Sequence, residues 1–220
     1  MKVTLNLPNG PLTLEVPDAG AGKGTIKGGH PLYYVAKQPR ATENYLTQIN
    51  SLLEDLPQGL DVFELCGGIG LVPAAVWDTI MPSSWTSVDI DPDCRKNYIA
   101  HGPHFVLGDM YEVRNFPKAD LVICDFPNNT LPKMWREPKR AELFRKIATM
   151  KPRWWEVTDV GYYWIHLANH WPIYQEKFGV QVTRQNYANL FDCFMRDNYG
   201  YKVTKMTVGG GAQYFLMEAV

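Results

Sequence analysis

The chain has 220 residues, 45% of them apolar and 20% charged, a composition typical of an ordinary globular protein. Its 22 basic and 23 acidic residues nearly balance, which excludes a surface that is basic throughout, so a polyanion site would need locally segregated charge. No stretch approaches the ~18 continuous apolar residues of a membrane span, and the first residues lack the hydrophobic region of a signal peptide. A cytoplasmic location is therefore expected. Four cysteines without a CxxC pair predict reduced thiols.

The first 40 residues predict an extension to the main domain. Alternating apolar residues on either side of Pro8-Asn9-Gly10 indicate a β-hairpin. A glycine-rich segment follows, and its Gly22-Lys23-Gly24-Thr25 lacks the spacing of a phosphate loop, which favours a plain loop. Apolar residues then recur at helical spacing from Thr42, which is the expected N-cap, to Leu56. The expected organisation is an extension over residues 1–40 and one domain over residues 41–220.

Beyond this helix the pattern changes to alternating strands and helices, which is typical of a parallel sheet covered on both faces. Two last strands across Gly209-Gly210-Gly211 predict an antiparallel hairpin at the end of the chain. The expected strands are residues 61–65, 85–89, 105–107, 120–125, 154–160, 201–208 and 213–219. The expected helices are residues 71–80, 92–100, 139–150, 163–178 and 187–196.

A glycine turn and three acids mark the expected carboxyl edge of this sheet. Gly67-Gly68-Ile69-Gly70 follows the first buried strand, where glycines let the backbone approach a ligand closely. Glu64, Asp89 and Asp109 lie at the ends of three successive strands, and an acid at the end of the second strand binds ribose in such folds. Each acid alone would be an ordinary strand-end residue. Together with the turn they predict a cofactor site, and the spacing of the glycines does not fit a nicotinamide dinucleotide site.

With these residues the sequence resembles the class I S-adenosylmethionine-dependent methyltransferases. Motifs carry the resemblance over residues 61–129, and the order of elements extends it to Val220, because that family ends in an antiparallel hairpin. It implies an α/β fold with a Rossmann-like, mostly parallel sheet, helices on both faces, and S-adenosylmethionine as the cofactor. It also implies that Asp89 binds the ribose hydroxyls and that Asp109 lies near the adenine amino group. One departure is Cys66, where many members have glycine. The cofactor-binding residues implied by the resemblance are Glu64, Cys66, Gly67, Gly68, Gly70, Asp89, Ile90, Asp109 and Met110.

Asp125-Phe126-Pro127-Asn128 follows the apolar strand that ends at Cys124. It resembles the Asp/Asn-Pro-Pro-aromatic motif of methyltransferases that modify amino groups, in which the acid and a backbone carbonyl accept hydrogen bonds from the target NH₂. Asp125 and Pro127 fit this motif, whereas Phe126 and Asn128 depart from it. These four residues are the catalytic candidates, acting by positioning and electrostatics without a covalent intermediate. The alternative is a strand-to-loop turn stabilised by Asp and Pro.

Two other chemistries are less favoured. Cys124 lies inside an apolar strand, so a buried, inert thiol is expected there, not the nucleophile of a cytosine C5 methyltransferase. His166 and His170 are four residues apart on an expected helix, but no third ligand accompanies them, so no metal site is expected.

Positive charge is concentrated directly after the Asp125 loop, where residues 133–153 contain eight basic and two acidic residues. Aromatic residues are interleaved with these cations and continue to Trp154 and Trp155. Cations for phosphates and flat rings for bases favour contact with single-stranded nucleic acid. A solvated basic helix face beside aromatic core residues would have the same composition. The candidate nucleic-acid contacts are Lys133, Trp135, Arg136, Lys139, Arg140 and Lys146.

The sequence thus predicts a methyltransferase that acts on an amino nitrogen, with a base of DNA or RNA as the favoured acceptor. A small-molecule or protein methyltransferase would use the same cofactor half without needing the basic segment. A noncatalytic adaptor of the same fold would explain the imperfect motif at Asp125. Little chain is left for sequence-specific recognition, so a protein partner could supply specificity.

Overall fold

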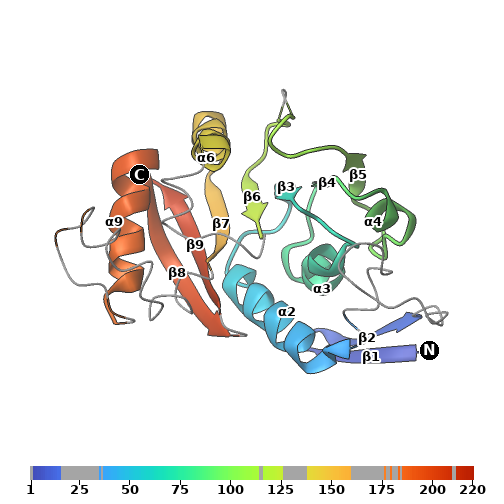
Figure 1. The fold of residues 1–220 in the computed structure, drawn as a ribbon. Helices are drawn as coiled ribbons and strands as arrows, with labels where there is room; N and C mark the ends of the chain where they lie inside the picture. Colours follow the sequence, from blue (N-terminus) through green and yellow to red (C-terminus); the bar gives the residue numbers. More distant parts are fainter. Residues whose placement is uncertain are drawn as a thin grey trace.

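The computed structural model describes residues 2–15, 35, 37–113, 116–125, 138–159, 176, 179, 183, 185–209 and 212–220. Seven strands form the central sheet: β3 (Asp61–Leu65), β4 (Ser84–Asp89), β5 (His104–Leu107), β6 (Leu121–Cys124), β7 (Trp154–Asp159), β8 (Tyr201–Gly209) and β9 (Ala212–Ala219). Their order is β5-β4-β3-β6-β7-β9-β8, and β9 alone runs in the direction opposite to the other six strands (Figure 1). The predicted α/β fold with an antiparallel C-terminal hairpin is confirmed, and the expected strand ends are correct to within one residue.

Helices cover both faces of the sheet (Figure 1). The helices α2 (Pro39–Leu53) and α3 (Leu71–Ile80) pack on one face, and α6 (Pro138–Met150) and α9 (Tyr187–Tyr199) pack on the other. The expected N-cap at Thr42 is wrong, because α2 begins at Pro39 and its N-cap is Gln38, four residues earlier. Pro39 fits the first turn of a helix, where no backbone N–H is needed, and the Thr42 hydroxyl donates to the Gln38 carbonyl instead.

The expected helix over residues 92–100 is shorter in the structure, where α4 spans Pro92–Lys96. Asp91 caps its start by accepting a hydrogen bond from Asp93 N, as an N-cap residue does. The C-cap of the helix is Asn97, whose side-chain amide donates a hydrogen bond to the Asp93 carbonyl. This side-chain bond satisfies a carbonyl that a further helical turn would otherwise help to satisfy. The expected helix over residues 163–178 lies outside the continuous described segments.

The N-terminal hairpin is present as predicted. Strands β1 (Lys2–Leu7) and β2 (Gly10–Glu15) pair across the two-residue turn of Pro8 and Asn9. The hairpin lies against α2 and buries Leu5 and Leu14 in the same core cluster as that helix. Asn9 fixes its tip, since its side-chain amide donates to the Thr79 hydroxyl at 2.7 Å and to the Ala75 carbonyl at 3.0 Å.

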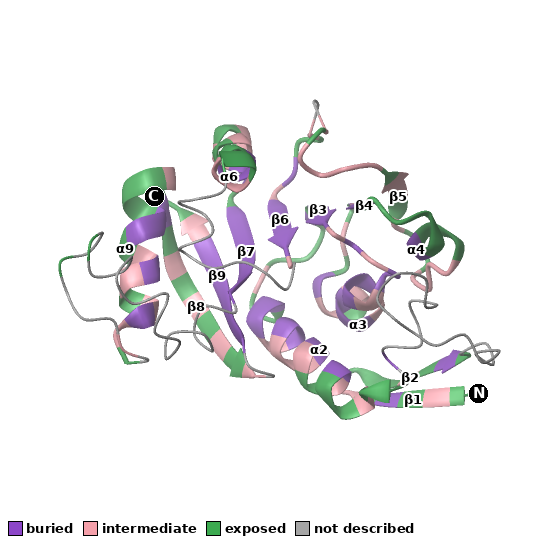
Figure 2. Ribbon diagram, viewed as in Figure 1, coloured by how far each residue is buried: buried purple, intermediate pink, exposed green. Residues whose placement is uncertain are grey.

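The core forms two clusters, one on each face of the sheet. Figure 2 shows the buried residues along β6, β7 and β9. The central strand β7 is buried along its whole length, because its neighbours β6 and β9 and the covering helices leave neither face open. Trp154 packs into the cluster under α2 and α3, whereas Trp155 packs against Phe144 and Tyr201 on the opposite face. No helix in the described part of the chain is long and apolar enough to cross a membrane.

Candidate active site

The glycine turn after β3 forms the floor of a cavity of about 260 Å³ at the carboxyl edge of the sheet. At Gly67 a β-carbon would lie 2.7 Å from Ser87 Cβ, so only glycine fits against β4. Gly70 adopts a left-handed backbone conformation, and a β-carbon there would meet the ring of Tyr98 at 2.8 Å. Cys66 occupies a position at which the methyltransferases that the sequence resembles commonly have glycine. Its φ of 61° lies in the left-handed region that glycine adopts most easily, which explains that preference. The residues that line the cavity include Glu64, Cys66, Gly67, Gly68, Ile69 and Asp125.

Glu64 is a buried carboxyl at the end of β3. Its Oε2 accepts hydrogen bonds from the Ser87 hydroxyl at 2.5 Å and from Trp85 Nε1 at 3.0 Å. Burial raises the pKa of Glu64 to about 7, although these two hydrogen bonds act in the opposite direction. Ser87 was missed in the sequence. Four of the six residues of β4 are polar, so nothing in the sequence singled out Ser87.

Asp89 and Asp109 lie at the same edge of the sheet as the turn. Asp89 Oδ2 accepts from Gly68 N and its Oδ1 accepts from Asp91 N, both at 2.9 Å. The Asp89 carbonyl accepts from Gly108 N at 2.9 Å, which brings the loop after β5 to the end of β4. In that loop Asp109 Oδ1 accepts from Tyr111 N at 2.9 Å. The predicted acids are therefore brought together around the carboxyl ends of β3, β4 and β5.

Two further predicted residues lie beside these acids. Met110 Sδ is 3.3 Å from Cys66 Sγ, so the loop after β5 closes over the glycine turn. Ile90 follows Asp89 and is 66% exposed, which leaves an apolar surface next to the acid. Burial and the surrounding acids raise the pKa of the Cys66 thiol to about 12, so it remains protonated and unreactive.

Asp125, at the end of β6, lines the same cavity as Glu64 and the glycine turn. Burial raises the pKa of Asp125 to about 6, while a hydrogen bond with Thr158 on β7 opposes this effect. The remaining catalytic candidates Phe126, Pro127 and Asn128 lie outside the described residues. Cys124 is fully buried, as expected of an inert thiol.

Two polar residues of β7, Glu156 and Thr158, lie on the strand next to β6 and were not predicted. Both are buried, and the Thr158 hydroxyl lies 3.0 Å from Glu156 Oε1. Cys124 N donates to Glu156 Oε2 at 3.2 Å, so the Glu156 carboxyl bridges β7 and β6. Their signal in the sequence was the presence of polar residues in a strand whose apolar neighbours predict full burial.

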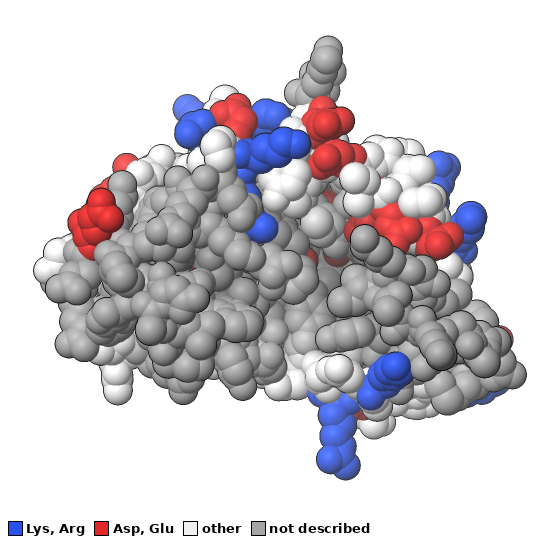
Figure 3. Space-filling model, viewed as in Figure 1, with Lys and Arg blue, Asp and Glu red and all other residues white. Residues whose placement is uncertain are grey.

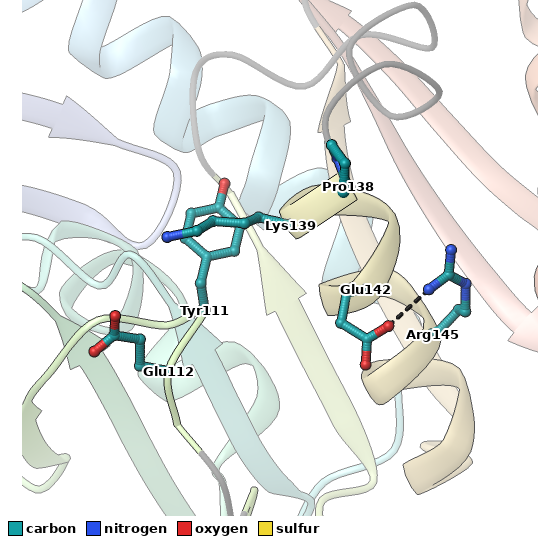
Figure 4. Close-up of a pocket in the computed structure, with 6 residues that line it drawn as sticks. All are labelled: Tyr111, Glu112, Pro138, Lys139, Glu142 and Arg145. Carbon is teal, nitrogen blue, oxygen red and sulfur yellow. Dashed lines mark hydrogen bonds and ion pairs between the residues drawn. The ribbon is translucent and has the colours of Figure 1, made fainter.

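Two basic residues of α6, Lys139 and Arg145, border a second cavity of about 450 Å³ between that helix and the loop after β5. Figure 4 shows Lys139 reaching across toward Tyr111, and Glu142 paired with Arg145 at 2.7 Å. Lys146 Nζ donates to the Tyr111 carbonyl at 3.2 Å, which ties α6 to that loop. Figure 3 shows Lys and Arg gathered over α6, apart from a group of acids near α4 and β5.

The other nucleic-acid candidates divide into two groups. Lys133, Trp135 and Arg136 lie outside the described residues. The extension of the aromatic series to Trp154 and Trp155 is wrong, because both rings are buried in the core and present no stacking face to solvent. Arg153 lies over the Trp154 ring at 4.3 Å and pairs with Glu218.

Among proteins of known structure, this arrangement of strands and helices recurs in methyltransferases. The magnesium protoporphyrin IX methyltransferase of Synechocystis is 15% identical, with 90% of each chain covered and a TM-score of 0.54. The methyltransferase domain of bacterial CtHen1-C is 12% identical over 81% of this chain and 98% of that one, with a TM-score of 0.57. The chain has the class I methyltransferase fold.

A third structure with this fold is the methyltransferase in a complex with a Haloferax volcanii methyltransferase activator. It is 16% identical over 88% of this chain and 99% of that one, with a TM-score of 0.53. No protein-family model and no curated protein sequence matches the chain. Since proteins of this fold differ widely in their acceptors, the acceptor must be argued from the site itself.

Proposed function

We propose that the protein is an S-adenosylmethionine-dependent methyltransferase that acts on an amino nitrogen, with a nucleic-acid base as the favoured acceptor. The observation that carries this proposal is that Glu64, the glycine turn and Asp125 line a single cavity. A cofactor held at the turn would have its reactive end within the space that Asp125 also borders. The sulfonium group of the cofactor supplies an electrophilic methyl group, and the residues of the chain hold and orient the two reactants.

The cofactor would be held by the acids at the ends of β3, β4 and β5. A carboxylate has about four acceptor positions, and the two backbone amides on Asp89 leave room for two ribose hydroxyls. Exposed Ile90 next to Asp89 offers an apolar surface for the adenine ring. Glu64 would face the positively charged methionine end, which fits its place at the floor of the cavity. Structural neighbours have been solved with S-adenosylhomocysteine and with S-adenosylmethionine, which supports this choice of cofactor.

Asp125 would accept a hydrogen bond from the target amino group. Such a bond aims the nitrogen lone pair at the methyl group and favours the positive charge that develops on nitrogen during transfer. Asp125 lines the cavity at the end of β6, and a carboxylate oriented there before the substrate binds would need little reorganisation during the reaction.

A nucleic-acid acceptor is favoured by the separation of charge between two neighbouring regions. Lys139, Arg140 and Lys146 belong to α6, which borders the loop after β5 on one side of the site. Phosphates would bind there while a base reaches the cavity. A small-molecule acceptor is the second candidate, since the second cavity beside α6 has a volume of about 450 Å³.

The first test is calorimetric titration of the protein with S-adenosylmethionine. Asp89→Ala should weaken binding at least ~10-fold, because charge-assisted hydrogen bonds contribute ~1.5–3 kcal/mol. Asp78→Ala, which removes an exposed aspartate of α3, is the matched control and should bind normally. Absence of binding by the unmutated protein would overturn the proposal.

The acceptor is then identified by incubation with methyl-labelled cofactor and separate pools of DNA, RNA, protein and a small-molecule extract. Label in the DNA or RNA pool supports the favoured acceptor, and digestion to nucleosides locates the modified nitrogen. Label confined to protein or to a small-molecule extract would refute a nucleic-acid base as the acceptor while leaving methyl transfer in place.

A further inference from the structure

A series of hydrogen bonds connects Tyr98, in the segment between α4 and β5, with the carboxyl of Glu64. The hydroxyl oxygens of Tyr98 and Ser87 are 2.7 Å apart, and the Ser87 hydroxyl donates to Glu64 Oε2 at 2.5 Å. Trp85 Nε1 donates to the same Oε2 and to Ser87 Oγ, at 3.0 Å in each case. Ser87 and Glu64 are buried, whereas Tyr98 is half-buried. The series therefore runs from a residue outside the sheet to an acid that lines the cavity.

The direction of these hydrogen bonds follows from the number of hydrogens. A hydroxyl has one hydrogen, and an ionised carboxylate can only accept. Whenever Glu64 is ionised, Ser87 gives its hydrogen to Glu64, so Tyr98 must donate to Ser87. Burial and the charge of Glu64 raise the pKa of Tyr98, so its hydroxyl keeps the hydrogen that this order requires. The donors of the network are thus all directed toward one oxygen, Glu64 Oε2.

The other carboxyl oxygen of Glu64 is left for a ligand. Oε2 is enclosed by its donors and by Gly67, where a β-carbon would lie 3.0 Å from it. Among the described residues, none donates a hydrogen bond to Oε1, although Glu64 lines the cavity. A carboxylate oxygen with free acceptor positions is a strong partner for an ammonium group. If the proposed function holds, this group is the α-amino group in the methionine part of the cofactor.

The ring of Tyr98 also supports the glycine turn. A β-carbon at Gly70 would lie 2.8 Å from this ring, so the ring packs directly against the turn. The next residue, Ile99, donates from its backbone N to the Ile69 carbonyl at 2.9 Å. On β5, Phe105 contacts the Tyr98 ring edge-on, with the ring centroids 5.1 Å apart. These contacts hold the ring without the hydroxyl, so the two roles of Tyr98 can be separated by removal of the hydroxyl alone.

We infer that Tyr98 and Ser87 are positioning residues of the cofactor site, which hold Glu64 by Oε2 so that Oε1 accepts a hydrogen bond from the α-amino group of the bound cofactor. This inference rests on the proposed function, because it takes S-adenosylmethionine as the ligand. Neither residue has to touch the ligand. A carboxylate that is fixed before binding loses little freedom on binding, so the network increases affinity. The effect is confined to ligands with an amino-acid part, because adenosine has no ammonium group.

The inference is tested by calorimetric titration with two ligands. S-adenosylhomocysteine has the amino-acid part, whereas 5′-methylthioadenosine has the same adenosine and sulfur but lacks that part. Tyr98→Phe removes the hydroxyl and keeps the ring, and Ser87→Ala interrupts the network at its middle. Each variant should weaken the binding of S-adenosylhomocysteine at least ~5-fold and change that of 5′-methylthioadenosine less than ~2-fold. Tyr199→Phe, at the end of α9 on the opposite face of the sheet, is the matched control and should bind both ligands normally.

A double-mutant cycle shows whether the Tyr98 hydroxyl acts through Glu64. Glu64→Gln should itself weaken the binding of S-adenosylhomocysteine, since a neutral amide attracts an ammonium group less than a carboxylate does. Addition of Tyr98→Phe to Glu64→Gln should then change this binding less than ~2-fold. Equal weakening of both ligands, or additive effects in the cycle, would overturn the inference and make Tyr98 and Ser87 packing residues. Absence of binding of both ligands by the unmutated protein would refute the proposed function, and the inference with it.

Discussion

The buried Glu64 should make the stability of the unliganded protein depend on pH in a way that one substitution removes. Its pKa is raised from the ordinary 4.5 to about 7, so between these values the unfolded chain is ionised while the folded protein keeps the proton. The folded state then binds more protons, and the free energy of unfolding must fall as the pH rises through this window. A tenfold change in an ionisation constant is worth about 1.4 kcal/mol, which gives a total loss of about 3 kcal/mol by about pH 8.

Glu64→Gln is the substitution that tests this pH dependence, because it removes the ionisable group and keeps the size of the side chain. The amide oxygen can accept the hydrogen bonds from Ser87 and Trp85, and the amide cannot ionise. Urea unfolding of both proteins from about pH 4.5 to about pH 8 should show that the stability of the wild type relative to the variant decreases by about 3 kcal/mol. Glu112→Gln, at an exposed glutamate, should leave the profile of the wild type unchanged. Parallel profiles for the wild type and Glu64→Gln would refute the assignment of a neutral buried carboxyl.

Three further outcomes are expected. Asp125→Ala should lower kcat by ~10²-fold with the affinity for the cofactor nearly unchanged. Asp125→Asn should be tolerated better, because its amide oxygen can still accept the hydrogen bond from the target amino group. Equal kcat values for the wild type and Asp125→Ala would show that Asp125 is only a turn residue. Gly67→Ala should lower the free energy of unfolding by ~1–3 kcal/mol, since its methyl would overlap a β4 side chain, and an unchanged urea midpoint would contradict this packing. Reversal of Lys139, Arg140 and Lys146 to glutamate should reduce the salt dependence of nucleic-acid binding by ~0.7 in logarithmic slope for each phosphate that the variant no longer binds, with cofactor binding unaffected. An unmutated protein without measurable affinity for DNA or RNA at low salt would leave α6 as a solvated helix face.

The sheet could be predicted from the sequence because several of its strands, such as β3, β6 and β7, are short, buried runs, and because glycines or prolines lie near the strand ends. These patterns are local in the sequence, so the positions of the strands can be predicted without knowledge of which strands pair in the sheet. The start of α2 was misplaced for a different reason: Thr42 is a favourable N-cap residue, but Pro39 fits the first turn equally well and the helix gains a turn by starting there. Competing local preferences of similar size cannot be resolved from one sequence.

The interior of the candidate site could be predicted only in part. Glu64, Asp89 and Asp109 lie at or just beyond the ends of their own strands, so their place at one edge follows from the parallel order alone. Glu156 and Thr158 reach Asp125 through the register between β6 and β7, and nothing local in the sequence encodes that pairing. The same strand explains why Trp154 and Trp155 were misassigned. A central strand buries both of its faces, whereas the sequence shows only that aromatic residues follow a basic helix.

If the proposed function holds, the placement of charge explains how one small chain binds a cation and a polyanion at neighbouring sites. S-adenosylmethionine carries positive charge at its sulfonium and amino groups, which the acids at the ends of β3 to β6 would balance. The same acids repel phosphates, so a nucleic-acid backbone would be kept away from the cavity and held by the cations of α6. Only an uncharged base, turned out of its stack, could then approach Asp125. This geometry favours single-stranded or locally opened substrates over intact duplexes. A comparison of methylation rates on single strands and on matched duplexes tests that preference, and a faster rate on duplexes would contradict this account of the charge separation.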